Sequence, residues 1–167
     1  LKRTFGRILL IIVVITGLAG TVNEYSITKK ERKSAIILMN DSREDLIRSI
    51  KGLSEGQLNF KASKDHWSIK ECMYHIAISE KNIWGMLEGT MKAPANPEKR
   101  SEIKVTDEQL IKMIEDRSNK RKTIESFEPK NTPYQSMNEA LESYKNMRAD
   151  HIKYIRSTTE DMHNHII

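Results

Sequence analysis

Four short capping patterns, each at the start of an amphipathic stretch, constrain the fold of this chain more than any other feature. Each places a serine or threonine three residues before a glutamate or glutamine. The hydroxyl can then accept from the third helical amide, while the longer side chain reaches back to the cap. The patterns are Thr28/Glu31, Ser68/Glu71, Thr106/Gln109 and Ser136/Glu139. One match is weak evidence, but four that each open an amphipathic stretch form a consistent set.

Apolar residues recur with helical spacing after each of these starts. They predict helices at about residues 28–53, 68–88, 106–126 and 136–158. Gly89 is a natural stop for the second helix. The predicted inner face of that helix carries Ile69, Cys72, Ile76, Ile83 and Leu87. Because no stretch alternates as a strand does, the sequence predicts an all-α bundle of long helices over residues 28–167.

Composition and charge agree with this class. The chain is 38% hydrophobic and 31% charged, with few glycines and prolines, which suits amphipathic helices better than a sandwich or barrel. The net charge of +5 is spread over surfaces where both signs interleave. No basic stripe with interleaved aromatics is present, so nucleic-acid binding is not expected. The single cysteine, Cys72, excludes an internal disulfide and a zinc site built on several cysteines, and is expected to be buried.

The first residues have the pattern of a targeting segment. A short basic start is followed by a wholly apolar run from Ile8, and apolar and small residues continue to Val22. This stretch is shorter than the roughly 20 residues that a membrane-spanning helix needs. The pattern predicts a signal peptide at residues 1–20, with an uncleaved N-terminal anchor as the alternative. We therefore expect a bacterial protein that is exported (periplasmic or extracellular) or tethered, with membrane contact only through residues 1–22.

Residues 53–84 carry a more specific pattern. Leu53 is followed by the pair Gln57-Leu58, then by Trp67-Ser68-Ile69, and His75 lies eight residues after the tryptophan. This arrangement resembles the DinB/YfiT-like superfamily. The resemblance implies an up-down-down-up four-helix bundle. It also implies a divalent-metal site of three histidines, in which His75 corresponds to the first ligand.

The other two histidines of that family come from its last helix, at positions i and i+4, and this sequence contains no such pair. Two explanations remain open. If residues 136–158 are the final helix, His151 is the second member of the pair. Met147 then stands at the first position, where a thioether is a poorer ligand for zinc or nickel than imidazole. If they are the penultimate helix, the last helix is missing from this chain. We prefer the second explanation because residues 148–165 resemble the segment that precedes a further loop and a final histidine-bearing helix in that family. The leucine start and the apolar end also fit a truncated sequence.

The resemblance implies a metal-dependent hydrolase or thiol-transferase, in which zinc or nickel activates water or a thiol, acting on an unknown substrate. His75 is the candidate metal ligand and His151 the weaker alternative. Glu71 and Glu80 are nearby carboxylates, although Glu71 is already assigned to a capping box. The competing hypothesis is a non-catalytic exported module with a degenerate metal site, which binds a partner or a small-molecule ligand in its cleft. A missing helix would leave an apolar stripe exposed, which favours a homodimer.

Overall fold

The computed structural model describes residues 26–116, 118 and 122–166, and every regular element in that part is helical. This confirms the all-α prediction. The elements are α2 (Lys29–Ile50), α3 (Glu55–Asn59), α4 (Ile69–Lys92), a 3₁₀ helix (Pro97–Glu102), α5 (Asp107–Glu115), 3₁₀ helices Glu125–Phe127 and Pro129–Asn131, and α6 (Met137–Ser157). The predicted targeting segment at residues 1–20 lies outside the described residues. None of the described helices is long and apolar enough to span a membrane.

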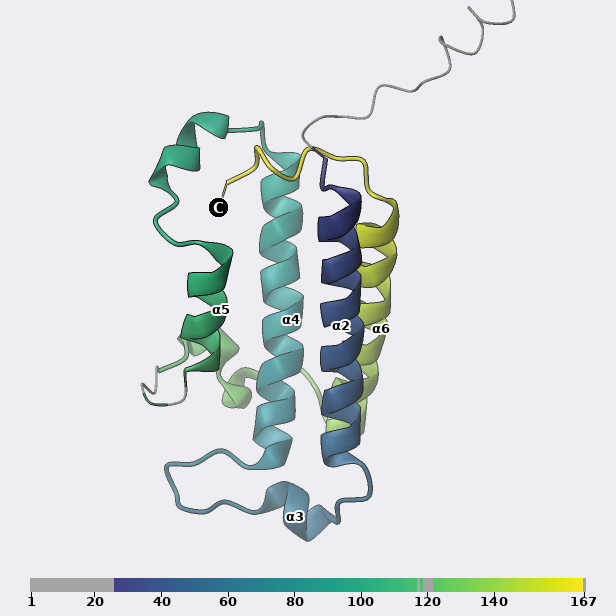
Figure 1. Ribbon diagram of the computed structural model, residues 1–167. Helices are drawn as coiled ribbons and strands as arrows, with labels where there is room; N and C mark the ends of the chain where they lie inside the picture. The colour runs from purple at the N-terminus through teal and green to yellow at the C-terminus, as the bar shows by residue number, and fades with distance from the viewer. Residues whose placement is uncertain (1–25, 117, 119–121, 167) are drawn as a thin grey trace, which may run out of the picture.

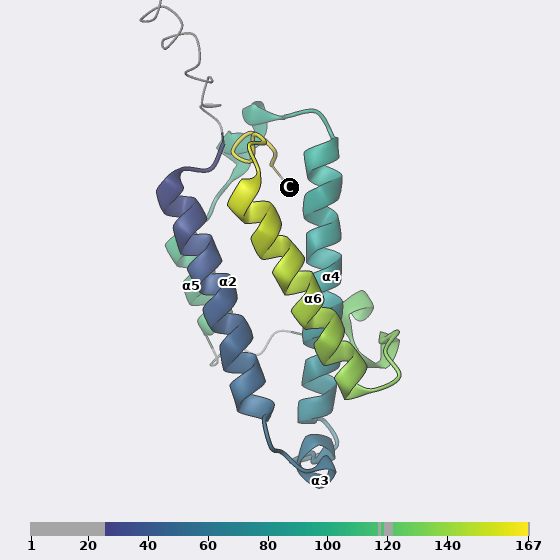
Figure 2. The same cartoon turned by 90° about the vertical axis from the view of Figure 1, so that its right-hand side faces the viewer.

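Three long helices, α2, α4 and α6, form the body of the protein (Figure 1). Helix α6 packs against both α4 and α2. Figures 1 and 2 show that α4 and α6 run in the same direction, while α2 runs in the opposite one. The connection through α3 reverses the chain, whereas the long segment 93–136 returns it to the end where α4 began. The three helices therefore have the directions of the first three in an up-down-down-up bundle.

The predicted helix starts are confirmed. Complete capping boxes begin α2, α4 and α5 at Thr28, Ser68 and Thr106. At the start of α6, the Ser136 hydroxyl accepts from the amide of Glu139 at 3.1 Å. The carboxylate of Glu139 instead accepts from the neighbouring Gln135 amide at 2.7 Å. Helix α3 has a box of its own, Ser54 with Gln57, which the sequence analysis did not assign.

The predicted helix ends are less accurate. Helix α4 passes Gly89 and ends at Lys92, with Ala93 in an extended conformation. Ala93 precedes a proline, which disfavours helical backbone in the residue before it. The helix predicted over 106–126 ends at Glu115. Its C-cap Asp116 accepts from the Ser118 amide at 2.8 Å, a local turn that competes with helical hydrogen bonding.

The core lies where α4 crosses α6. Its buried residues are Met73, Tyr74, Ala77, Ala140 and Tyr144. Ala77 and Ala140 are completely buried. Tyr144 and Met73 are the largest side chains that are fully buried there. The core at this crossing therefore combines large side chains with two small alanines.

The face of α4 that is buried differs from the predicted one. The four buried residues of α4 are Met73, Tyr74, Ala77 and Ile78. Ile83, which the sequence analysis placed inward, is 57% exposed, and Cys72 is also exposed. Helix α4 is apolar on two faces, and α6 packs against only one of them. In the described structure, exposed apolar side chains remain on α2 and α4, among them Ile37, Leu38, Ile83 and Met86.

Arg32 ties α2 to the end of α6. Its guanidinium donates to the carbonyl oxygen of Ile155, and to that of Thr158 at 2.8 Å. Both carbonyls belong to the last turn and cap of α6, where backbone acceptors have no partner within the helix. A single charged side chain therefore satisfies two of these acceptors and joins two elements far apart in the sequence.

Replacing Arg32 with alanine should lower the free energy of unfolding by about 1.5–3 kcal/mol, the usual contribution of hydrogen bonds to a charged group. Urea denaturation followed by circular dichroism measures this difference. The matched control is Lys33→Ala, an exposed change one residue along the same helix, which should stay within about 0.5 kcal/mol of the parent. Equal stability of the two variants would contradict the capping role.

Candidate functional site

His75 lies in the second turn of α4 and is partly buried. Its Nδ1 atom is 2.8 Å from the carbonyl oxygen of Phe127, in the 3₁₀ helix that packs against α4. A carbonyl oxygen only accepts, so Nδ1 must carry the proton and donate it. The Ser79 hydroxyl lies farther away, at 3.5 Å, and the ring of Trp67 is tilted against the imidazole with centroids 5.0 Å apart. Backbone and aromatic contacts thus fix both the ring and its tautomer.

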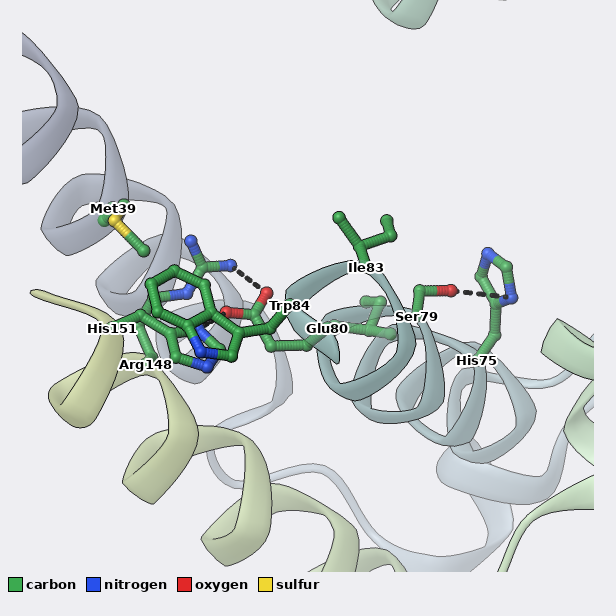
Figure 3. Close-up of a pocket in the computed structure, with 9 residues that line it drawn as sticks. Met39, His75, Ser79, Glu80, Ile83, Trp84, Arg148 and His151 are labelled. Carbon is green, nitrogen blue, oxygen red and sulfur yellow. Dashed lines mark hydrogen bonds and ion pairs between the residues drawn. The ribbon is translucent and has the colours of Figure 1, made fainter. Parts of the chain in front are cut away.

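This tautomer leaves the second ring nitrogen, Nε2, with a free lone pair. Figure 3 shows one ring nitrogen of His75 joined to Ser79 by a dashed line and the other nitrogen without one. No hydrogen-bond partner for it is found among the described residues. Metal-binding histidines are commonly held in this way, with one nitrogen donating to a backbone carbonyl and the other presented to the ion. His75 therefore has the local geometry of a ligand.

An open groove runs along α4 from His75 and has a volume of about 330 Å³. Helices α2, α4 and α6 all contribute to it (Figure 3). Its lining residues are Met39, His75, Ile76, Ser79, Glu80, Ile83, Trp84, Arg148 and His151. The groove combines apolar walls with a few polar groups, which is the usual make-up of a small-molecule site.

A charged cluster from α4 and α6 lies at the other end of this groove. Glu80 accepts from Nδ1 of His151 at 2.7 Å through Oε1, and from Arg148 at 2.8 Å through Oε2. The side chains of Glu80 and Arg148 are only 14% and 16% exposed. Trp84 stacks on His151, with ring centroids 3.6 Å apart and an interplanar angle of 10°. The cluster therefore joins α4 to α6 through one ion pair, one hydrogen bond and one stacked ring pair.

Arg148 also contacts the core. Its guanidinium lies 5.1 Å from the centre of the Tyr144 ring, and burial raises the pKa of the Tyr144 hydroxyl. The Nε atom of Arg148 is buried and has no hydrogen-bond partner among the described residues. The charge of Arg148 is thus balanced almost entirely by Glu80, since no other ion pair to it is found in the described part of the chain.

The structure brings His75 and His151 into one groove but not into contact. Glu80, which holds His151, follows His75 by five residues, about 7.5 Å along the helix axis. The described residues contain no group of three histidine, cysteine, aspartate or glutamate side chains that could hold a metal ion. The remaining histidines lie elsewhere: His66 contacts Ser63, His163 contacts Glu31, and His165 contacts the carbonyl of Thr90.

Sequence reasoning had singled out His75, His151 and Glu80 but not Arg148 or Trp84. A signal for both was present. Arg148 precedes His151 by three residues, and Trp84 follows Glu80 by four, so each pair shares one helix face. What the sequence lacked was the pairing of those two faces across the α4–α6 contact.

Comparison with known proteins gives one family and one relative. The family model of the DinB superfamily matches residues 38–167. An uncharacterised protein of Bacillus subtilis (strain 168), YuaE, is 33% identical over 93 residues, which cover 55% of this chain. The matched stretch spans about half of that relative, 52% of its length. No solved structure matches the chain.

Proposed function

Because this chain belongs to the DinB superfamily, we propose that it acts as a divalent-metal-dependent enzyme, a hydrolase or a thiol-transferase, with His75 as one metal ligand. The observation that supports this most directly is the hydrogen bond from His75 Nδ1 to the Phe127 carbonyl, which leaves Nε2 available beside an open groove. A zinc or nickel ion bound there would activate a water molecule or a thiol.

Among the described residues, His75 fits the role of a metal ligand and His151 fits it less well. His75 has the orientation and the tautomer of a ligand, and the Phe127 carbonyl that holds it has the role of an outer-shell partner. His151 is less suited, because it is only 5% exposed and Trp84 covers its ring face. We therefore assign one ligand to His75, and assign no others.

His75→Ala should remove the stoichiometric metal from the full-length protein. After expression and dialysis against trace zinc or nickel, elemental analysis of the purified protein measures the metal-to-protein ratio. His66→Ala is the matched control, because His66 is exposed and contacts only Ser63 among the described residues. Circular dichroism confirms that both variants are folded. Unchanged metal content in the His75 variant would reject the proposal.

A second candidate is a non-catalytic module that binds a small ligand in the same groove. The ion pair of Glu80 with Arg148 favours it, because a carboxylate already neutralised by an arginine is a poor partner for a cation. On this hypothesis the folded protein retains no metal after the same dialysis. Tight retention of zinc or nickel would count against it.

A further inference from the structure

Glu80 and His151 form a pair in which a carboxylate orients an imidazole. The carboxylate oxygen accepts from Nδ1 at 2.7 Å, which places the ring proton on that nitrogen. Arg148 holds the other carboxylate oxygen at 2.8 Å, so the carboxylate cannot turn away from His151. The stacked ring of Trp84 fixes the imidazole plane. Three side chains thus hold one imidazole in one tautomer and one orientation.

The second nitrogen of this imidazole, Nε2, belongs to a residue that lines the groove. Nε2 of His151 has no hydrogen-bond partner among the described residues. Within that part of the chain, Arg148 Nε is the one fully buried side-chain nitrogen or oxygen atom without a partner. Nε2 of His151 is therefore not completely enclosed, although the residue is only 5% exposed. Because His151 lines the groove, a molecule that reaches its lone pair has to enter there.

We propose that His151 accepts a proton from a hydroxyl or thiol group of a ligand bound in this groove, with Glu80 as its positioning residue. The O–H or S–H bond breaks, an Nε2–H bond forms, and the electron pair stays on the oxygen or sulfur. The imidazolium that results lies against the Glu80 carboxylate, which stabilises its charge. A carboxylate-held histidine with one free nitrogen is the arrangement that general-base chemistry requires.

The inference rests on the proposed function for the kind of ligand, because a hydrolase or thiol-transferase must deprotonate water, a hydroxyl or a thiol. The groove adds a constraint on size. The axial rise from His75 to Glu80 is about 7.5 Å, and Ile76 and Ile83 line the groove as well. The ligand therefore has an apolar middle and places its hydroxyl or thiol about one and a half helical turns of α4 away from its His75 end.

The test is labelling of histidines by diethyl pyrocarbonate, read residue by residue by mass spectrometry. Only a nitrogen with a free, accessible lone pair attacks the reagent's carbonyl carbon; ethyl carbonate leaves as the C–O bond breaks. In the full-length protein, His151 should be labelled at Nε2. Glu80→Gln should slow this labelling, because the amide loses the charge that orients the ring and stabilises the cationic ring formed on attack. Glu88→Gln is the matched control, since Glu88 accepts from Trp84 on the same helix and does not contact His151.

The same measurement with and without a chelator separates this inference from the proposed function. Labelling of His151 should not change on chelation, whereas His75 should become more reactive when its ion is removed. Long-range ¹H–¹⁵N spectra of the parent give a second readout that needs no variant, and should show the neutral His151 ring protonated at Nδ1. A ring protonated at Nε2, no labelling of His151 while His66 reacts, or labelling of His151 that appears only after chelation would each overturn the inference.

Discussion

Replacing Glu80 with alanine should lower the free energy of unfolding by about 3 kcal/mol. Removing one partner of a mostly buried ion pair costs roughly 3–5 kcal/mol, because the other charge is left without compensation. The low end applies because both side chains line an open groove. Arg148 then keeps a buried charge whose Nε atom already lacks a partner, and His151 loses the acceptor for its Nδ1 proton.

A double-mutant cycle tests this explanation. Arg148→Met in the Glu80→Ala background removes the orphaned charge, so the double variant should be more stable than Glu80→Ala alone. Glu88→Ala, an exposed change on the same helix, should stay within about 0.5 kcal/mol of the parent. Urea denaturation of the parent, Glu80→Ala, Arg148→Met and the double variant gives the coupling energy. Additive effects of the two changes would show that the pair contributes no specific interaction.

Replacing Tyr144 with alanine should have an effect of similar size, about 3–5 kcal/mol, as for other large aromatic side chains removed from a core. Tyr144 is 2% exposed and lies beside Ala140 and Met73 at the α4–α6 contact. The cavity left behind cannot close easily, because the side chains around Tyr144 are themselves packed in the core. Thermal denaturation should therefore show a large fall in Tm.

Tyr144→Phe separates packing from the hydroxyl. It keeps the ring that fills the core and the face that Arg148 covers, so its cost should be below about 1.5 kcal/mol. If the phenylalanine variant is as unstable as the alanine variant, the hydroxyl and not the ring is the important group, and the packing explanation fails.

The helix starts could be predicted because capping is local. A hydroxyl and a carboxylate three residues apart meet their partners within one turn, whatever the rest of the chain does. The C-terminal boundaries of α4 and α5 depended on a residue before proline and on an aspartate turn, which are weaker signals than glycine. The buried face of α4 could not be predicted, because two of its faces are apolar and only the position of α6 selects one.

For the candidate site, the sequence indicated some of the side chains but not the contacts between them. His75 was predicted as the first ligand from the resemblance, His151 as a weaker alternative, and Glu80 as a carboxylate on the same helix as His75. The partner that orients His75 is the backbone carbonyl of Phe127, 52 residues away, and a carbonyl has no sequence signature. The pairing of Arg148 with Glu80 was equally hidden, since it depends on how two helices cross and not on neighbours in the chain.

The packing of α2 against α6, which is distant in the sequence, has a consequence for synthesis on the ribosome. The contact of Arg32 with Ile155 joins residues 123 positions apart. At roughly 5–20 residues per second, about 5–21 s pass between synthesis of the end of α2 at Ile50 and of the end of α6 at Ser157. During that interval the apolar side chains of α2 have no α6 to pack against.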